Sequence, residues 1–208
     1  MRTIVAIAGR SGAGKDAAAD ALQRIMAFKN VKLSGPLKQA ATAMFGVPHD
    51  CFCDNDLKDV PLHALRGSTP RAVLQWLGTD VMQHGLITSG LLPGIGRGFW
   101  ARRLADTIDT LPPSENRVVI SDMRFQHELD FLRKRYGNQL LAIRIVRDLK
   151  LECTPDGAIE LEHESERVVD ALDVDLVVHN DGTLNGLHQA VISIATLHIE
   201  TSHAPLRE

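Results

Sequence analysis

Short and almost unbroken runs of apolar residues recur along the chain and predict its strands. The first run is Ile4–Ala8, and residues 117–122, 140–146 and 176–180 follow the same pattern, with a shorter run at 31–34. Runs of this kind are typical of strands that are buried on both faces, as in parallel sheets. We therefore expect a sheet that is covered on both sides.

Between these runs, apolar residues recur at helical spacing. The predicted helices cover residues 17–26, 37–45, 99–108, 126–136 and 184–197, and another starts with Thr69 as its N-cap and Pro70 as its first residue. Residues 46–69 and 85–98 are expected to be irregular, and 201–208 to form a tail. Strands that alternate with helices predict the α/β class, with a mostly parallel sheet and helices on both faces.

Composition and charge narrow the class of protein. The chain has 208 residues, 44% of them hydrophobic, and a formal net charge of −3. This charge argues against nucleic acid as a partner, because the chain carries no basic arm or stripe. Cys51, Cys53 and Cys153 lack the spacing of a zinc site and are expected to be free thiols. No signal peptide and no apolar run long enough for a bilayer are evident, which indicates a cytoplasmic protein without membrane contact, in the host cytoplasm if the chain is viral.

A glycine-rich loop follows the first predicted strand and precedes the first predicted helix. It reads Gly-Arg-Ser-Gly-Ala-Gly-Lys-Asp over residues 9–16. Strand, glycine loop and helix in this order are the context of a phosphate-binding P-loop, in which backbone N–H groups and the helix N-terminus surround an anion. Lys15 would then reach the β- and γ-phosphates of a nucleotide. A plain glycine turn is the alternative, but the position of Lys15 favours the P-loop.

Asp16 departs from the usual P-loop pattern. It stands where Ser or Thr normally offers a hydroxyl to Mg²⁺. A carboxylate can hold Mg²⁺ directly or through water, although it also brings negative charge close to the triphosphate. We expect Asp16 to be the metal-binding residue.

Further polar residues follow other predicted strands. Lys38 comes shortly after the strand at 31–34, Asp122 and Arg124 end the strand at 117–122, and Arg147 follows the strand at 140–146. In open α/β sheets, ligands bind beyond the carboxyl ends of the strands. Asp122 has the placement of an acid that holds Mg²⁺ or contacts an acceptor, although an aspartate there is also a common helix N-cap. Together with the glycine loop, these residues suggest two phosphate subsites, as in a kinase that acts on a phosphorylated small molecule.

Longer segments carry more specific patterns. They are Gly14-Lys15-Asp16, residues 33–38 (LSGPLK), 56–61 (DLKDVP), 69–71 (TPR), 74–80 (LQWLGTD), Phe99-Trp100, residues 121–125 (SDMRF) with Glu128, 163–166 (HESE) and 179–182 (HNDG). In this order they resemble the deoxynucleoside monophosphate kinases of bacteriophages, along most of the chain. The segment 74–80 and the Asp-x-Arg pattern with its trailing Glu are the most specific. Asp16 is itself a habit of this family.

The resemblance implies an activity and a set of site residues. The activity is transfer of the γ-phosphoryl group of ATP, with Mg²⁺, to a deoxynucleoside 5′-monophosphate. ATP would be bound by Ser11, Gly12, Ala13, Gly14, Lys15, Asp16 and Ala17. The acceptor would be bound by Lys38, Arg71, Gly78, Thr79, Trp100, Asp122, Arg124, Glu128 and Ser165, with Lys58 and Arg147 as weaker candidates. The catalytic residues would be Lys15, Asp16, Asp122 and Arg124.

The resemblance also implies an organisation of the chain. A single P-loop kinase domain with a three-layer fold would cover residues 1–200, with an acceptor-binding insertion at about 46–100 and a lid at about 148–164. Residues 201–208 would be a tail. Members of the family often form homodimers, so a homodimeric state stays open.

Two other functions share part of these patterns. Phosphomevalonate kinases of the animal type have the Gly-Lys-Asp loop, the Ser-Gly-Pro-Leu-Lys segment and the Asp-x-Arg strand end. Residues 74–80 and Phe99-Trp100 favour the nucleotide kinase, because an aromatic ring suits a base or sugar better than a small branched acid. The second alternative is a P-loop protein that binds a nucleotide without turnover.

Overall fold

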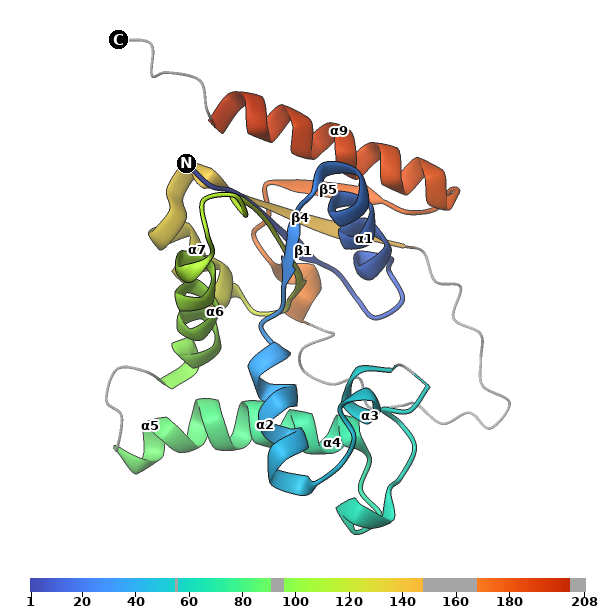
Figure 1. The fold of residues 1–208 in the computed structure, drawn as a ribbon, viewed down its shortest axis with the longest axis vertical. Coiled ribbons are helices and arrows are strands. Elements are labelled where there is room, and N and C mark those ends of the chain that lie inside the picture. Colours follow the sequence, from blue (N-terminus) through green and yellow to red (C-terminus); the bar gives the residue numbers. More distant parts are fainter. Residues whose placement is uncertain (55, 91–95, 148–167, 203–208) are drawn as a thin grey trace. The chain divides into compact units, whose positions relative to one another are not determined.

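The computed structural model describes residues 1–208 except 55, 91–95, 148–167 and 203–208 (Figure 1). The chain forms two compact units. The first consists of Met1–Lys32 and Ala105–Glu208, and the second of Leu33–Leu104. The second unit is therefore inserted into the first, between the residue that follows the second strand and the middle of helix α6 (Phe99–Thr110).

The first unit is built on a parallel sheet. Its five strands are β1 (Thr3–Ala8), β2 (Lys29–Val31), β3 (Arg117–Met123), β4 (Leu140–Val146) and β5 (Leu176–His179), in the spatial order β2-β3-β1-β4-β5. Every pairing is parallel, and Ala8 lies opposite Met123 while Val146 lies opposite His179. The carboxyl ends of β1, β3, β4 and β5 therefore meet at one edge, where the loops that follow them gather.

Helices cover both faces of this sheet (Figure 1). Val5 and Ile7 of β1 pack in one apolar cluster with residues of α1 (Lys15–Met26) and α9 (Leu184–Ser202). Helix α7 (Gln126–Tyr136) lies on the other face with the Ala105–Thr110 part of α6, and the two are joined by a hydrogen bond of 3.2 Å from the Tyr136 hydroxyl to the Ala105 carbonyl. All six residues of β1 are buried, as the unbroken apolar run predicts. The predicted α/β class, with a parallel sheet and helices on both faces, is confirmed.

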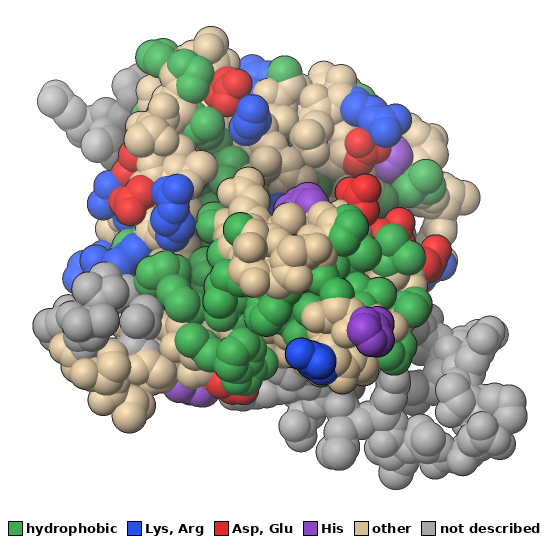
Figure 2. Space-filling model, turned by 60° about the horizontal axis from the view of Figure 1, so that its bottom comes forward, with side chains coloured by type: hydrophobic (Ala, Val, Ile, Leu, Met, Phe, Trp, Pro, Cys, Tyr) green, Lys and Arg blue, Asp and Glu red, His purple; other side chains and the backbone are tan. Residues whose placement is uncertain are grey.

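The second unit is mainly helical. It contains α2 (Gly35–Phe45), α3 (His49–Cys53), α4 (Pro70–Gln75), a π-helical segment (Trp76–Gly85), α5 (Leu86–Ser89) and the start of α6, with 3-10 turns at His63–Leu65 and Gly96–Gly98. Thr69 caps α4 as predicted, because its hydroxyl accepts a hydrogen bond of 3.1 Å from the amide of Ala72. Apolar side chains gather at the surface in Figure 2, and the large exposed ones among the described residues of this unit are Met44, Leu57, Val60 and Trp76.

Several predicted boundaries are wrong. The strand predicted at 31–34 is Lys29–Val31, because only these residues pair with β3, and Pro36 already stands in the first turn of α2. Thr201 and Ser202, predicted to lie in the tail, end helix α9, where Ser202 is buried. Segments predicted to be irregular contain α3, α5 and two 3-10 turns. Within the described part of the chain, no helix has both the length and the apolar character needed to cross a membrane.

Candidate nucleotide site

The glycine loop joins β1 to α1 in a backbone conformation that requires glycine. Gly9, Gly12 and Gly14 have φ angles of 147°, 74° and 103°. A Cβ atom on Gly9 would lie 2.5 Å from the carbonyl oxygen of Ile145, and one on Gly14 would lie 2.6 Å from Nδ2 of Asn180. Residues other than glycine rarely adopt these φ angles, and a Cβ atom at Gly9 or Gly14 would not fit. The loop therefore depends on its glycines.

Side chains from other strands hold this loop. The amide of Asn180, directly after β5, donates a hydrogen bond of 2.9 Å from Nδ2 to the carbonyl oxygen of Ala13, which is buried. Within the loop, the carbonyl oxygen of Arg10 accepts a bond of 3.2 Å from the Ala13 amide and one of 2.6 Å from the Lys15 ammonium. The ammonium of Lys15 therefore lies against the backbone of the glycine loop.

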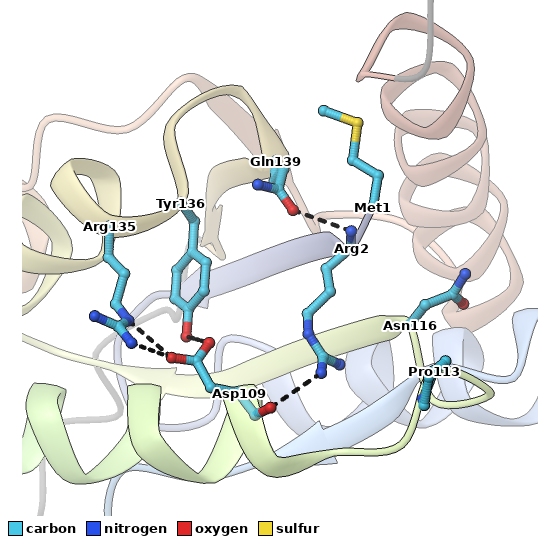
Figure 3. Close-up of a pocket in the computed structure, with 8 residues that line it drawn as sticks. All are labelled: Met1, Arg2, Asp109, Pro113, Asn116, Arg135, Tyr136 and Gln139. Atoms are coloured by element: carbon cyan, nitrogen blue, oxygen red, sulfur yellow. Dashed lines mark hydrogen bonds and ion pairs between the residues drawn. The ribbon is translucent and has the colours of Figure 1, made fainter.

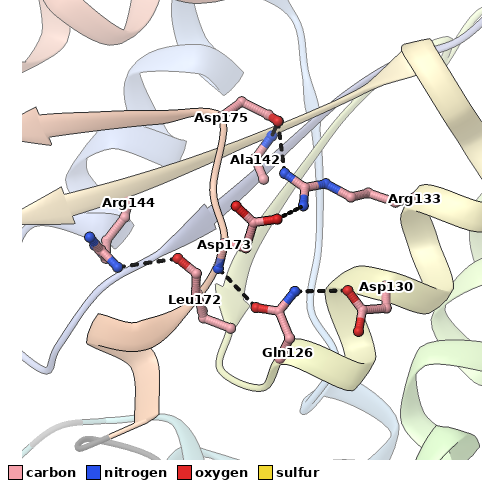
Figure 4. Close-up of polar contacts among 8 residues, drawn as sticks. All are labelled: Gln126, Asp130, Arg133, Ala142, Arg144, Leu172, Asp173 and Asp175. Atoms are coloured by element: carbon pink, nitrogen blue, oxygen red, sulfur yellow. Dashed lines mark hydrogen bonds and ion pairs between the residues drawn. The ribbon is translucent and has the colours of Figure 1, made fainter.

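A segment that precedes β5 anchors the other side of the loop. The Arg10 Nε atom donates a bond of 2.8 Å to the carboxylate of Asp170. Arg144 of β4 donates to the Asp170 carbonyl oxygen and, at 3.3 Å, to that of Leu172. Figure 4 shows how residues 172–175 are in turn held against α7 and β4, mainly by Arg133, which binds the carboxylates of Asp173 and Asp175 at 3.0 and 2.7 Å. The loop is thus tied to a packed part of the first unit.

Asp16 lies in the first turn of α1 with an exposed carboxylate. Its Oδ1 atom forms an ion pair of 2.8 Å with the ammonium of Lys32, the residue that follows β2. A carboxylate at a helix N-terminus is favoured by the helix dipole. Sequence reasoning did not identify Lys32, because no local pattern links two residues that are far apart along the chain.

The next strand brings Asp122 and Arg124 to the same edge of the sheet. Ala8, which precedes the glycine loop, lies opposite Met123 in the register of β1 and β3. Asp122 and Arg124 flank Met123, and both are half-buried. The predicted grouping of these residues beside the loop therefore follows from the strand register.

Glu128 lies in the first turn of α7 and holds the backbone that follows β3. It is 4% exposed, and its Oε2 atom accepts hydrogen bonds of 3.2 and 3.1 Å from the amides of Arg124 and Phe125. Burial raises the pKa of its carboxyl to about 7, and the two amide hydrogen bonds only partly oppose this effect. In the structure, Glu128 fixes the backbone of Arg124 and caps the N-terminus of α7.

The second unit holds the other candidates. Arg71 forms a two-point ion pair with Asp59, with Nε–Oδ1 and Nη2–Oδ2 distances of 2.6 and 2.9 Å, and this hydrogen-bonded pairing lowers the pKa of the Asp59 carboxyl. The indole Nε1 atom of Trp100 donates a bond of 2.9 Å to the carbonyl oxygen of Gly78, and the ring is only 7% exposed. The structure therefore brings Gly78 and Trp100 together inside this unit.

The hydrogen bonds and ion pairs described above assign no role to the remaining candidates. Lys38, in α2, and Thr79, in the π-helical segment, are half-buried, as is Lys58. Arg147 is exposed directly after β4. Ser165 and the lid expected at 148–164 lie outside the described residues.

A cavity lies at the opposite, amino-terminal edge of the sheet (Figure 3). It has a volume of about 530 Å³ and is lined by residues that precede strands, such as Arg2, Asn116 and Gln139. The Arg2 guanidinium donates a bond of 2.7 Å to the Leu111 carbonyl oxygen, while Asp109 is bound by Arg135 and the Tyr136 hydroxyl. These contacts tie the segment after α6 to the sheet, which is a structural role.

Comparison with protein families shows where the chain belongs. The family model for deoxynucleotide monophosphate kinase matches residues 55–191, which is more than half of the chain. The chain belongs to the deoxynucleotide monophosphate kinase family. A relative from Acanthamoeba polyphaga mimivirus, described as "Putative deoxynucleotide monophosphate kinase", is 28% identical over 194 residues, covering 91% of this chain and 94% of the relative.

Solved structures of small-molecule kinases show a weaker likeness to this member of the family. A shikimate kinase from Aquifex aeolicus has a TM-score of 0.46 and 10% identity, covering 97% of this chain and 100% of that one. A gluconokinase from Sinorhizobium meliloti has a TM-score of 0.45 and 12% identity, covering 97% and 98%. The fold assignment therefore rests on the strand order and helix layers described above.

The family match separates the candidate residues into two groups. It includes Arg71, Gly78 and Trp100 of the second unit and Asp122 to Glu128 of the first. The glycine loop at residues 9–16 precedes the matched range, so the family match does not cover it.

Proposed function

We propose that the protein transfers the γ-phosphoryl group of ATP to a deoxynucleoside 5′-monophosphate. Membership of the deoxynucleotide monophosphate kinase family supports a phosphotransferase of this class. The observation that carries the proposal is the glycine loop with Lys15 at the head of α1, beside Asp122 and Arg124 at the same sheet edge. One edge thus offers groups for both a donor and an acceptor phosphate.

The donor would be held by the loop from Ser11 to Ala17. Its backbone amides and the N-terminus of α1 suit the phosphates of ATP, and the Lys15 ammonium would leave the Arg10 carbonyl to contact the β- and γ-phosphates. Mg²⁺ prefers oxygen ligands and is usually held by one or two carboxylates together with substrate phosphates. The exposed carboxylate of Asp16 fits this requirement, and the ion would neutralise charge on the phosphates when bound.

Arg124 would be the main residue that holds the acceptor's phosphate. Arg124 offers a planar, permanently charged guanidinium to the acceptor phosphate, and Glu128 fixes its backbone. Asp122 would contact the acceptor or a water molecule on the metal. The family resemblance assigns Lys38, Arg71, Gly78, Thr79, Trp100 and Ser165 to acceptor binding as well.

The reaction needs little chemistry from the protein. An oxygen of the acceptor's phosphate attacks the γ-phosphorus of ATP, the bond from that phosphorus to the β-γ bridging oxygen breaks, and ADP leaves with the bond's electron pair. The residues contribute by holding the two phosphates in line and by compensating their charge. We expect Lys15 and Arg124 to provide this compensation, and Asp16 to hold the Mg²⁺ that would add to it.

A substrate panel tests the proposal. ADP release is measured with each deoxynucleoside monophosphate, with each ribonucleotide counterpart, with mevalonate 5-phosphate and without an acceptor. We expect turnover that depends on a deoxynucleoside monophosphate. Turnover that depends on mevalonate 5-phosphate, or ATP binding without turnover under any condition, would contradict the proposal.

A further inference from the structure

Asp16, the last residue of the glycine loop, forms an ion pair with Lys32, the residue that follows β2. The atoms Oδ1 and Nζ lie 2.8 Å apart, and the side chains are 73% and 36% exposed. Asp16 belongs to the first turn of α1, and Lys32 directly follows β2, whose neighbour in the sheet is β3. Both residues belong to the first unit, so the contact is internal to it.

The negative charge of Asp16 is unfavourable for phosphate binding at the glycine loop. The N-terminus of α1 and the glycine loop favour an anion, but a carboxylate in the same turn repels the phosphates that would bind there. A serine or threonine at this position would create no such conflict. A cation close to Asp16 reduces this repulsion, because it attracts the phosphates that the carboxylate repels.

We propose that Lys32 is a positioning residue that keeps the loop receptive to a nucleoside triphosphate by neutralising Asp16. This inference rests on the proposed function only in requiring that ATP binds at the loop. Lys32 matters most for the nucleotide without a metal, because a divalent cation brought by the nucleotide would compensate the same carboxylate. Loss of Lys32 therefore weakens the binding of metal-free ATP more than the binding of MgATP.

The chain offers a matched control. Lys29 is the first residue of β2, three residues before Lys32, and it forms a longer ion pair of 3.5 Å with Glu115. Lys32→Met and Lys29→Met remove the same charge from the same segment, and Lys32→Arg keeps the charge. Binding of a non-hydrolysable ATP analogue is measured by isothermal titration calorimetry, in EDTA and in Mg²⁺, and melting curves compare the folding of the variants.

We expect Lys32→Met to raise the Kd in EDTA by about tenfold, equivalent to about 1.4 kcal/mol. Lys29→Met and Lys32→Arg stay within about twofold of the unchanged protein, and in Mg²⁺ the effect of Lys32→Met falls to about threefold or less. Equal values of Kd for Lys32→Met and Lys29→Met would overturn the inference. So would a loss that is as large in Mg²⁺ as in EDTA.

A double-mutant cycle identifies how Lys32 acts. If Lys32 neutralises Asp16, the loss caused by Lys32→Met disappears when Asp16 is already Asn, so the two changes are strongly non-additive. A full tenfold loss in the Asp16→Asn background would mean that Lys32 acts on the nucleotide itself, which contradicts the inference. If the unchanged protein binds no ATP analogue, the proposed function fails together with the inference. If it binds the analogue and Lys32→Met binds equally well, only the inference fails.

Discussion

Replacing Glu128 by Gln is expected to change how the stability of the protein depends on pH. The carboxyl is buried, and both of its hydrogen bonds, from the amides of Arg124 and Phe125, end on one oxygen. The amide oxygen of Gln can accept the same two bonds. The substitution therefore keeps the contacts and removes only the ionisation.

The direction of the effect follows from the raised pKa. Burial raises the pKa of the Glu128 carboxyl from 4.5 to about 7, so the folded protein keeps a proton that the unfolded chain has already lost. The neutral carboxyl stabilises the fold below pH 4.5, and this contribution is lost as the pH rises through about 7. The shift corresponds to about 3 kcal/mol of unfolding free energy, as an order of magnitude.

Urea denaturation at pH 5, 6, 7 and 8 measures the effect. At pH 5 Glu128→Gln and the unchanged protein should have similar free energies of unfolding, and at pH 8 the variant should be more stable by up to about 3 kcal/mol. Glu200→Gln, on the exposed face of α9, is the matched control and should show no such trend. A stability difference between Glu128→Gln and the unchanged protein that is constant from pH 5 to pH 8 would refute the reasoning.

Three further substitutions have expected outcomes. Gly14→Ala, measured by urea denaturation, should cost about 1–3 kcal/mol, because φ is 103° and the new Cβ would lie 2.6 Å from the side chain of Asn180. Trp100→Phe should cost about 1–3 kcal/mol in the same assay, because the buried carbonyl of Gly78 loses its indole donor. Arg124→Lys should raise the KM for the acceptor and leave the KM for ATP nearly unchanged in steady-state kinetics. Lysine keeps the positive charge but lacks the planar guanidinium that can donate two parallel hydrogen bonds to a phosphate.

Each of these changes has a control. Gly182→Ala meets no atom within 4 Å, Trp76→Phe alters a half-exposed ring, and Arg97→Lys alters an exposed guanidinium. If Gly182→Ala lost as much stability as Gly14→Ala, or Trp76→Phe as much as Trp100→Phe, the structural reason given for that test variant would be wrong. An unchanged KM for the acceptor in Arg124→Lys would contradict the proposed role of Arg124 in acceptor binding.

The middle of the sheet was predictable from the sequence because β3, β1 and β4 are largely buried, whereas the edge strands β2 and β5 are mostly exposed or half-buried. Buried strands appear as unbroken apolar runs, and the predicted bounds of β1, β3, β4 and β5 agree with the structure to within one residue. The π-helical segment Trp76–Gly85 was not predictable, since its apolar positions follow nearly the same spacing as those of an α-helix. The short helix α3 lies in a segment rich in charged residues and carries too few periodic positions to show a pattern.

The site was predictable only where one local pattern defines it. The glycine loop is such a pattern, and the edge position of Asp122 and Arg124 follows from the end of a strand. The pairing of Asp16 with Lys32 and the bond from Asn180 to the loop join residues that are distant in sequence, so spacing alone could not indicate them.

The burial of Glu128 was also hidden, because a glutamate after an Asp-x-Arg pattern resembles an exposed pocket residue. Only the packing of α7 against the sheet shows that its carboxylate is enclosed.

Transfer of a labelled phosphoryl group tests the central claim most directly. ATP labelled in its γ-phosphoryl group is incubated with Mg²⁺ and one deoxynucleoside monophosphate at a time, and the products are separated. We predict that the label appears in the deoxynucleoside diphosphate with the unchanged protein and with the control Lys134→Ala, an exposed position on α7, but falls by more than about tenfold with Lys15→Ala. Label that stays in ATP or appears only in inorganic phosphate with every acceptor, or full transfer by Lys15→Ala, would contradict the account.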